Sequence, residues 1–171
     1  MAQLTTDIER EEAAVGVGDP IPVGLSAFAF TTAILGCVYA GFILPGVGKG
    51  ISLAVATALL YGGLIQILAG MWEFRKGNTW AATIFTSYGG FLAAFGVIFL
   101  PAFGIEHALT ANATLDPALG LFFLCWTIFS GILFLGSLRT NVAMLLVLAL
   151  MFLSYLFLTI GELAGASTVL L

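Results

Sequence analysis

The chain has 171 residues, of which 61% are hydrophobic and 8% are charged, and its mean hydropathy is +1.14. A soluble domain carries about 25% charged residues, so this chain has too little polar surface to cover a water-soluble globule. Five basic residues against nine acidic ones give a net charge of −4, which argues against binding to a nucleic-acid backbone. Composition therefore excludes a cytosolic enzyme, a nucleic-acid-binding module and a disordered regulator.

Five long runs contain no Asp, Glu, Lys, Arg or His. They are residues 22–44, 51–72, 80–100, 117–136 and 140–161. Each is close to the about 20 residues that a helix needs to cross roughly 30 Å of hydrocarbon. Because backbone polar groups in lipid must be satisfied within the segment, these runs predict helices. The predicted fold class is an all-α integral membrane bundle with five transmembrane helices and short connections.

Residues 1–18 precede the first run and are acidic, with Asp7, Glu9, Glu11 and Glu12. We expect this segment to be a disordered cytoplasmic tail. The first run is too long for the apolar region of a signal peptide, and it follows an acidic segment where a signal peptide would be basic. We therefore expect it to be retained as a membrane span.

The second run places small and polar residues on one helix face. These residues are Gly62, Gln66, Ala69, Gly70 and Glu73. Small residues allow close helix approach, and Gln66 near the membrane middle is costly unless it is partnered or hydrated. Gln66 is either an interhelical hydrogen-bonding group or a polar group that lines a solute path. Glu73, beside Arg75 and Lys76, is either half of an interfacial ion pair or part of a gate or proton relay.

The third run follows a predicted turn at Gly77, with Asn78 or Thr79 as the helix cap. Its helical periodicity predicts two stripes. The small, partly polar stripe contains Thr79, Thr83, Thr86, Ser87, Gly90 and Ala94, and the aromatic stripe contains Phe85, Tyr88, Phe91, Phe95 and Phe99. Aromatic stripes are typical of packing, but the Tyr88 hydroxyl lies deep in the membrane and needs a partner.

The basic residues predict the orientation. With the N-terminus in the cytoplasm, four basic residues lie on the cytoplasmic side and one outside: Arg10, Arg75, Lys76 and Arg139 against Lys49. Cytoplasmic loops carry the excess of Lys and Arg, so a cytoplasmic N-terminus is predicted. The loop 101–116 then faces outward.

The fourth run begins like the first. Residues 19–25 and 116–121 both read Asp-Pro, a short spacer and Gly-Leu. One interpretation is two similar helix starts, because Asp caps a helix and Pro suits its first turn. The other is a three-helix repeat, which this orientation would make inverted, as in many transporters. Two such units need six helices, and residues 162–171 are too few to span. We therefore expect residues 19–171 to form one transmembrane domain that lacks the sixth helix.

Other functional classes lack the residues that they need. No run contains a Lys for a Schiff base, and the single histidine, His107, lies in a predicted loop. Cys37 and Cys125 lie in apolar runs and form no CxxC motif, and no set of residues has metal-ligand spacing. We therefore expect no enzymatic activity, no catalytic residue, no cofactor and no metal.

The motifs along the chain resemble those of the acetate uptake transporter family, which joins bacterial acetate/succinate permeases with fungal acetate and ammonia-export-associated proteins. That family opens with Asn-Pro-Ala-Pro-Leu-Gly-Leu, and residues 19–25 match it at both prolines, the glycine and the final leucine. Residues 61–79 resemble the second family block, and Phe85-Thr86-Ser87-Tyr88-Gly89 resembles the third. The similarity runs from about residue 19 to the end of the chain.

The resemblance implies six transmembrane helices per protomer, a hexamer, and a separate path for acetate in each protomer. It places a hydrophobic constriction on Phe28, Tyr88 and Met151, where the family usually has Leu at the last position. It also puts Asp19 where the family has Asn, and a carboxylate there should repel an anion unless it is protonated or paired. The residues that we expect to contact the solute are Asp19, Gly24, Leu25, Gln66, Glu73, Asn78, Thr79, Thr83 and Ser87.

These observations predict a transport path in the plasma membrane for acetate and related short carboxylates, a class to which succinate belongs. We expect this transport to be proton-linked or channel-like. The expected partners are small carboxylates, protons, membrane lipids and further copies of the chain, with no nucleic acid. Two alternatives remain open. The same path could carry another small solute such as ammonia or water, or the protein could be a membrane structural or sensor protein without transport.

Overall fold

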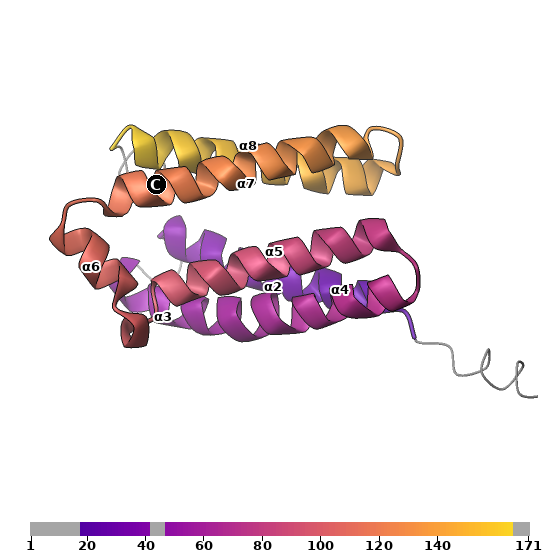
Figure 1. Cartoon of the computed structure of the whole chain (residues 1–171), viewed down its shortest axis with the longest axis horizontal. Helices are drawn as coiled ribbons and strands as arrows, with labels where there is room; N and C mark the ends of the chain where they lie inside the picture. The colour runs from indigo at the N-terminus through magenta and orange to yellow at the C-terminus, as the bar shows by residue number, and fades with distance from the viewer. Residues whose placement is uncertain (1–17, 42–46, 166–171) are drawn as a thin grey trace, which may run out of the picture. The chain divides into compact units, whose positions relative to one another are not determined.

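The structure is a computed structural model that describes residues 18–41 and 47–165, and the side chains of these residues except 47–51. The described elements are all helical (Figure 1). Five helices are long and apolar enough to cross a membrane: Ile21–Tyr39, Ser52–Arg75, Thr79–Ile98, Leu115–Ser137 and Val142–Leu163. The predicted all-α class with five membrane spans is confirmed. The predicted tail lies outside the described residues, apart from Gly18.

The chain divides into two compact units, Met1–Phe99 and Leu100–Leu171. The first unit contains α2 (Ile21–Tyr39), α3 (Val47–Thr57), η1 (Ala58–Ile65), α4 (Gln66–Arg75) and α5 (Thr79–Ile98). The second contains η2 (Pro101–Phe103), α6 (Ile105–Ala111), α7 (Leu115–Ser137) and α8 (Val142–Leu163). We describe each unit by itself.

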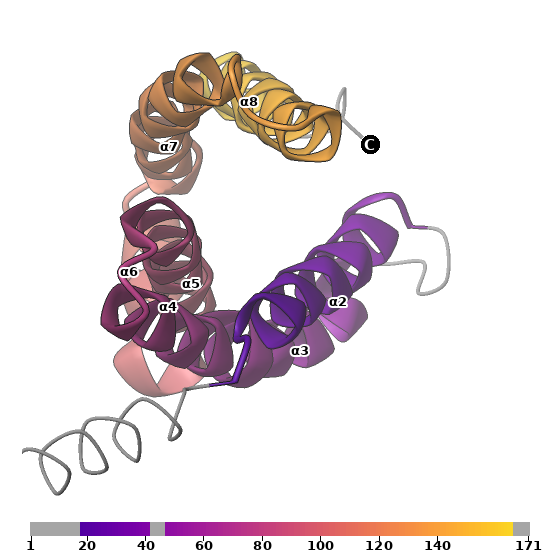
Figure 2. The same ribbon diagram turned by 90° about the vertical axis from the view of Figure 1, so that its right-hand side faces the viewer.

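In the first unit, small residues let three spans pack closely. The elements α3, η1 and α4 follow one another without a break, and Figure 2 shows α2 beside them. A Cβ atom on Gly89 of α5 would lie 2.9 Å from the backbone nitrogen of Ile67, so α4 and α5 are almost in backbone contact there. Gly24 of α2 faces the Phe85 ring, and a Cβ atom added to Gly24 would lie 2.9 Å from the nearest ring carbons. Gly62 and Gly70, the glycines predicted to allow close approach, do so as well: an added Cβ would lie 2.6 Å from the Thr31 hydroxyl oxygen and 2.8 Å from the Thr86 backbone nitrogen.

In the second unit, α7 and α8 form a helical hairpin held by both polar and aromatic contacts. The buried hydroxyls of Thr127 and Thr159 are hydrogen-bonded at 3.0 Å across the two helices. The rings of Phe134 and Phe152 stack with centroids 6.3 Å apart. Asn141 caps α8, because its side-chain oxygen accepts the Met144 N–H at 2.9 Å.

Several predicted boundaries and connections need correction. The predicted loop 101–116 contains η2 and the short helix α6. Because α7 begins at Leu115, Asp116 lies inside its first turn and is not its cap, although a carboxylate there still favours the helix dipole. At the other helix start, Pro20 is the N-cap residue, and Asp19 before it accepts the Ile21 N–H at 3.3 Å. The first helix ends at Tyr39, before the end of the apolar run.

The two helices that begin with Asp-Pro also share a buried pattern. In α2 the buried positions include Gly24, Ala27 and Thr31, and in α7 they include Gly120, Phe123 and Thr127. Both sets have the spacing i, i+3 and i+7. This agreement supports the three-helix repeat interpretation, whereas the inverted relation of the two units stays a prediction.

Candidate functional site

Four polar residues meet at one end of the first unit. Asp19 precedes α2, Glu73 lies in the last turn of α4, Lys76 is the C-cap residue of α4, and Asn78 is the N-cap residue of α5. The Lys76 ammonium donates a hydrogen bond to Asp19 Oδ1 at 3.0 Å and lies 3.6 Å from Glu73 Oε1. Asn78 Nδ2 donates to Glu73 Oε2 at 2.5 Å. We call these four residues the terminal polar cluster.

The local sequence explains why these groups converge. Gly77 has a φ of 79°, a left-handed conformation that glycine adopts at no steric cost. The Gly77 N–H then donates to the Phe74 carbonyl, and the Asn78 N–H donates to the Glu73 carbonyl, both at 3.0 Å. The Asn78 side chain accepts the Ala81 N–H at 3.3 Å and so caps α5. Of the two predicted caps, the structure therefore selects Asn78 over Thr79.

The terminal polar cluster runs from solvent into the protein. The exposed side-chain fraction falls from 57% for Asp19 through 32% for Lys76 to 0% for Glu73. The hydrogen bond from Lys76 lowers the pKa of Asp19, and the same bond raises the pKa of Lys76. Both groups are therefore charged at neutral pH. Asp19 is paired, which is the condition under which a carboxylate there need not repel an anion.

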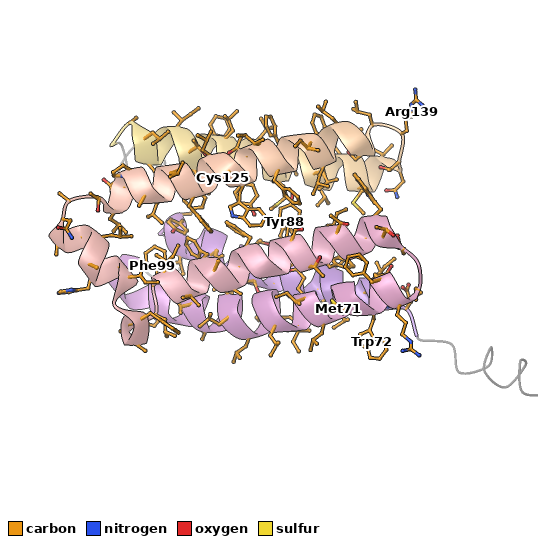
Figure 3. All side chains as sticks on the ribbon, in the orientation of Figure 1. Met71, Trp72, Tyr88, Phe99, Cys125 and Arg139 are labelled. Carbon is orange, nitrogen blue, oxygen red and sulfur yellow. The ribbon has the colours of Figure 1, made fainter. Side chains whose placement is uncertain are left out.

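A second group of predicted residues lies near the middle of the same unit. The rings of Phe28 and Tyr88 have centroids 5.8 Å apart, and Tyr88 is buried. Phe28 comes nine residues after Asp19, and Tyr88 ten residues after Asn78. At 1.5 Å per residue, both lie about 15 Å from the terminal polar cluster, which is half of a hydrocarbon core of roughly 30 Å. Figure 3 shows Tyr88 along the middle part of α5.

The predicted polar face of the second run is buried in the first unit. Gln66 is 1% exposed and Glu73 is fully buried, whereas Met71 and Trp72 of the same helix point outward (Figure 3). Among the described residues, Gln66 Oε1 and Glu73 Oε1 are buried side-chain oxygens without a hydrogen-bond partner. Of the two roles left open for Glu73, the ion pair is present, because the Lys76 ammonium lies 3.6 Å from Glu73 Oε1, although the Glu73 side chain is fully buried. A role in a gate or proton relay stays a prediction. Buried acceptors that lack donors are uncommon in proteins and point to a functional role.

One feature of the second span was missed from sequence. Eight residues, Ala58–Ile65, form a π-helix, a conformation that is often found at functional sites. Beside it, the buried Thr31 hydroxyl donates to the Thr57 carbonyl at 3.5 Å. A Cβ on Gly62 would lie 2.6 Å from that hydroxyl oxygen, so glycine is needed there. The Gly62-Gly63 pair was the available signal, although it does not distinguish a π-helix from close packing.

The remaining predicted site residues differ in how far they are exposed. Gly24 is buried, but Leu25 is 43% exposed and Thr79 is also exposed. Thr83 and Ser87 are half-buried, and the Thr83 hydroxyl donates to the Thr79 carbonyl of its own helix at 2.8 Å. Met151 is a half-buried residue of α8 in the second unit. In the described part of the chain, no three His, Cys, Asp or Glu residues are grouped as metal ligands would be.

The chain was compared with known proteins. The model of the GPR1/FUN34/yaaH family matches residues 3–171. Acetate permease A of Emericella nidulans is 42% identical over 151 residues, which cover 84% of this chain and 49% of the relative. The succinate-acetate/proton symporter SatP of Escherichia coli is 32% identical over 156 residues, which cover 90% of this chain and 77% of the relative.

Two further matches bear on structure and solute. The solved structure of the bacterial acetate channel SatP matches with a TM-score of 0.73 and 28% identity, covering 90% of this chain and 80% of that chain. Ammonia transport outward protein 2 of Saccharomyces cerevisiae is 35% identical and covers 86% of this chain. The chain spans about half the length of the fungal relatives that it matches.

Proposed function

Because the chain belongs to the GPR1/FUN34/yaaH family, we propose that it carries acetate and related short-chain carboxylates across a membrane. The observation that carries this proposal is the joint match, in sequence and in fold, to proteins named for acetate transport. The resemblance to acetate uptake transporters is confirmed by the family match. The five apolar spans make the chain an integral membrane protein. Two of the proteins that it resembles are named as a symporter and a channel, which supports a non-enzymatic role.

The physical mechanism follows from the cost of moving charge into lipid. An acetate ion is expensive to desolvate, whereas neutral acetic acid crosses an apolar constriction at much lower cost. The contact between Phe28 and Tyr88 at mid-depth supplies two sides of such a constriction. The family resemblance alone makes Met151 a further candidate for the constriction, and we assign the polar groups that hold the solute before and after it to Gln66, Asn78, Thr79 and Tyr88. Proton-linked uptake then amounts to passage of the acid form.

The membrane and the assembly belong to the same proposal. We place the chain in the plasma membrane, and the cytoplasmic N-terminus is supported by the excess of Lys and Arg in the loops assigned to the cytoplasm. A homo-oligomer, with a hexamer as the expected size, rests on the family resemblance. The large apolar side chains that α7 and α8 expose, such as Leu121, Ile132 and Leu150, suit lipid and further copies of the chain equally.

The test is uptake of labelled acetate into proteoliposomes under a pH gradient. Protein-free liposomes are the necessary control, because undissociated acetic acid also crosses a bare bilayer. We expect uptake above this control when the outside is more acidic, and we expect it to fall when the gradient is collapsed. Uptake equal to that of protein-free liposomes under both conditions would refute the proposal.

Ammonia is the second candidate solute, because a yeast relative of 35% identity is named for outward ammonia transport. Succinate is a further candidate solute, because the bacterial symporter is named for it. A competition panel of acetate, succinate and ammonium against labelled acetate separates these solutes. Replacing Tyr88 or Gln66 and finding unchanged flux but lost assembly would instead favour a structural role without transport.

A further inference from the structure

The Glu73 carboxylate is buried and only half satisfied. Its Oε2 accepts the Asn78 amide at 2.5 Å, whereas its Oε1 has no hydrogen-bond partner among the described residues. The Lys76 ammonium lies 3.6 Å from Oε1, which is too long for a hydrogen bond, and it donates to Asp19 at 3.0 Å instead. A buried charged oxygen without a donor is strongly unfavourable. Oε1 is therefore a buried acceptor position that the described residues leave without a donor.

The charges around Glu73 decide what kind of molecule fills that position. The terminal polar cluster has two carboxylates and one ammonium, so its formal charge is −1, and the two carboxylates share the Lys76 ammonium. The helices packed against this end, α2 and α5, contain no Asp, Glu, Lys, Arg or His. Arg75 follows on α4, but it is exposed. A carboxylate anion would thus meet a like charge and could not donate a hydrogen bond to it.

An undissociated carboxylic acid has the group that Oε1 lacks. Its O–H can donate to a carboxylate, and hydrogen bonds of this kind are among the shortest and strongest in proteins. On the basis of the proposed function, we propose that Glu73 Oε1 accepts the O–H of undissociated short-chain acids, so that this residue selects the acid form over its anion. Glu73 is then a specificity-determining residue and not only a structural partner of Asn78.

A second acceptor lies deeper along the same helix face. Gln66 comes seven residues before Glu73, and its Oε1 is likewise buried without a partner among the described residues. Seven residues correspond to two helical turns, or about 10 Å along the axis. The same O–H can therefore be accepted at two successive levels of the helix.

The experiment uses neutral molecules that share the shape of acetic acid but differ in hydrogen-bond donors. Acetamide has N–H donors, whereas acetone has none. Each is tested as an inhibitor of labelled acetate uptake by the full chain in proteoliposomes. We expect acetamide to inhibit at a concentration about tenfold lower than acetone, as one charge-assisted hydrogen bond predicts. Equal inhibition by the two molecules would overturn the proposal, and so would ammonium inhibiting as strongly as acetamide.

The Glu73→Gln variant makes the test specific to this residue. If its amide oxygen takes the Asn78 bond, its NH₂ group occupies the open position and donates. We therefore expect the preference for acetamide to disappear or to reverse in favour of acetone. Glu106→Gln makes the same chemical change at an exposed residue of α6 and should keep the preference. An unchanged preference in Glu73→Gln would overturn the proposal.

A binding measurement separates this inference from the transport proposal. Infrared difference spectra with isotope-labelled acetate distinguish the C=O band of the acid from the bands of the carboxylate. At mildly acidic pH, the bound acid band should appear with the unmodified chain and not with Glu73→Gln. If that band appears without flux, the transport proposal fails and this inference stands. Flux with only the carboxylate bands of bound solute would refute this inference alone.

Discussion

At the level of single residues, the replacement of the family's Asn by Asp19 is compensated within the chain. Asp19 Oδ1 accepts both the Lys76 ammonium at 3.0 Å and the Ile21 N–H at 3.3 Å. An asparagine can keep the second bond but loses the charge pairing. The charge of Lys76 is therefore divided between an exposed carboxylate and a buried one, and Lys76 makes a hydrogen bond to Asp19 but none to the buried Glu73.

Asp19→Asn should lower the thermal unfolding temperature slightly, by an amount that depends on pH. The pKa of Asp19 is below its ordinary 3.8, so its contribution is present above that pH and is lost as the pH falls through the lowered value. The pKa of Lys76 is above its ordinary 10.5, so its contribution is present below that pH and is lost as the pH rises further. The difference between variant and parent should stay constant between these limits and vanish in acid. A difference that changes near neutral pH would contradict this assignment.

Phe28→Ala should widen the proposed constriction. Removing the ring leaves Tyr88 without the aromatic partner that lies 5.8 Å away, so longer acids should pass more easily. We expect the ratio of butyrate to acetate uptake to rise several-fold. Phe30→Ala is the matched control, because that ring lies two residues on, is 56% exposed and contacts Tyr61 instead. An equal rise in both variants would show that Phe28 does not limit solute size.

At the level of helices, the contact between α4 and α5 depends on glycines that allow backbone approach. A Cβ on Gly89 would meet the Ile67 nitrogen at 2.9 Å and the Gly63 carbonyl at 3.0 Å, and backbone atoms cannot move aside individually. Gly89→Ala should therefore destabilise the protein by about 1–3 kcal/mol. The neighbouring Gly90 has open space around it, so Gly90→Ala should be neutral or stabilising by up to about 1 kcal/mol. Thermal unfolding in detergent compares the two, and equal effects would contradict close packing at Gly89.

The sequence predicts elements well where a single physical rule controls them. Apolar runs gave five spans because lipid requires about 20 apolar residues per helix, and Gly77-Asn78 gave the α4–α5 turn because of turn and capping chemistry. The π-helix Ala58–Ile65 could not be predicted, since its apolar residues also fit an α-helix. For Glu73, the sequence left an ion pair and a gate or relay open, because a charged residue beside other charges fits either role. Its complete burial depends on tertiary packing that no local sequence pattern encodes.

For the whole molecule, the orientation in the membrane is the prediction that determines which solution meets the terminal polar cluster. We expect a cytoplasmic N-terminus. With Cys37→Ala and Cys125→Ala as background, Ala108→Cys in α6 and Thr140→Cys after α7 introduce one exposed thiol each. An impermeant maleimide should label position 108 in intact cells, and position 140 only after permeabilisation. Arg139 lies in the α7–α8 turn (Figure 3), and a basic residue there favours a cytoplasmic location of that turn and of position 140.

The labelling pattern has a consequence for transport. Since α7 alone separates positions 108 and 140, labelling of both from one side would show that α7 does not cross the membrane. If each of the five helices crosses, the α4–α5 turn lies on the same side as position 140, because α5 and α7 are the two spans between them. Labelling of position 140 from the inside would then place Glu73 at the cytoplasmic mouth. An entering acid would reach the Phe28–Tyr88 constriction before Glu73, and Glu73 would be the last group to hold its proton before release. Labelling of position 140 from the outside would reverse this order and make Glu73 the first acceptor.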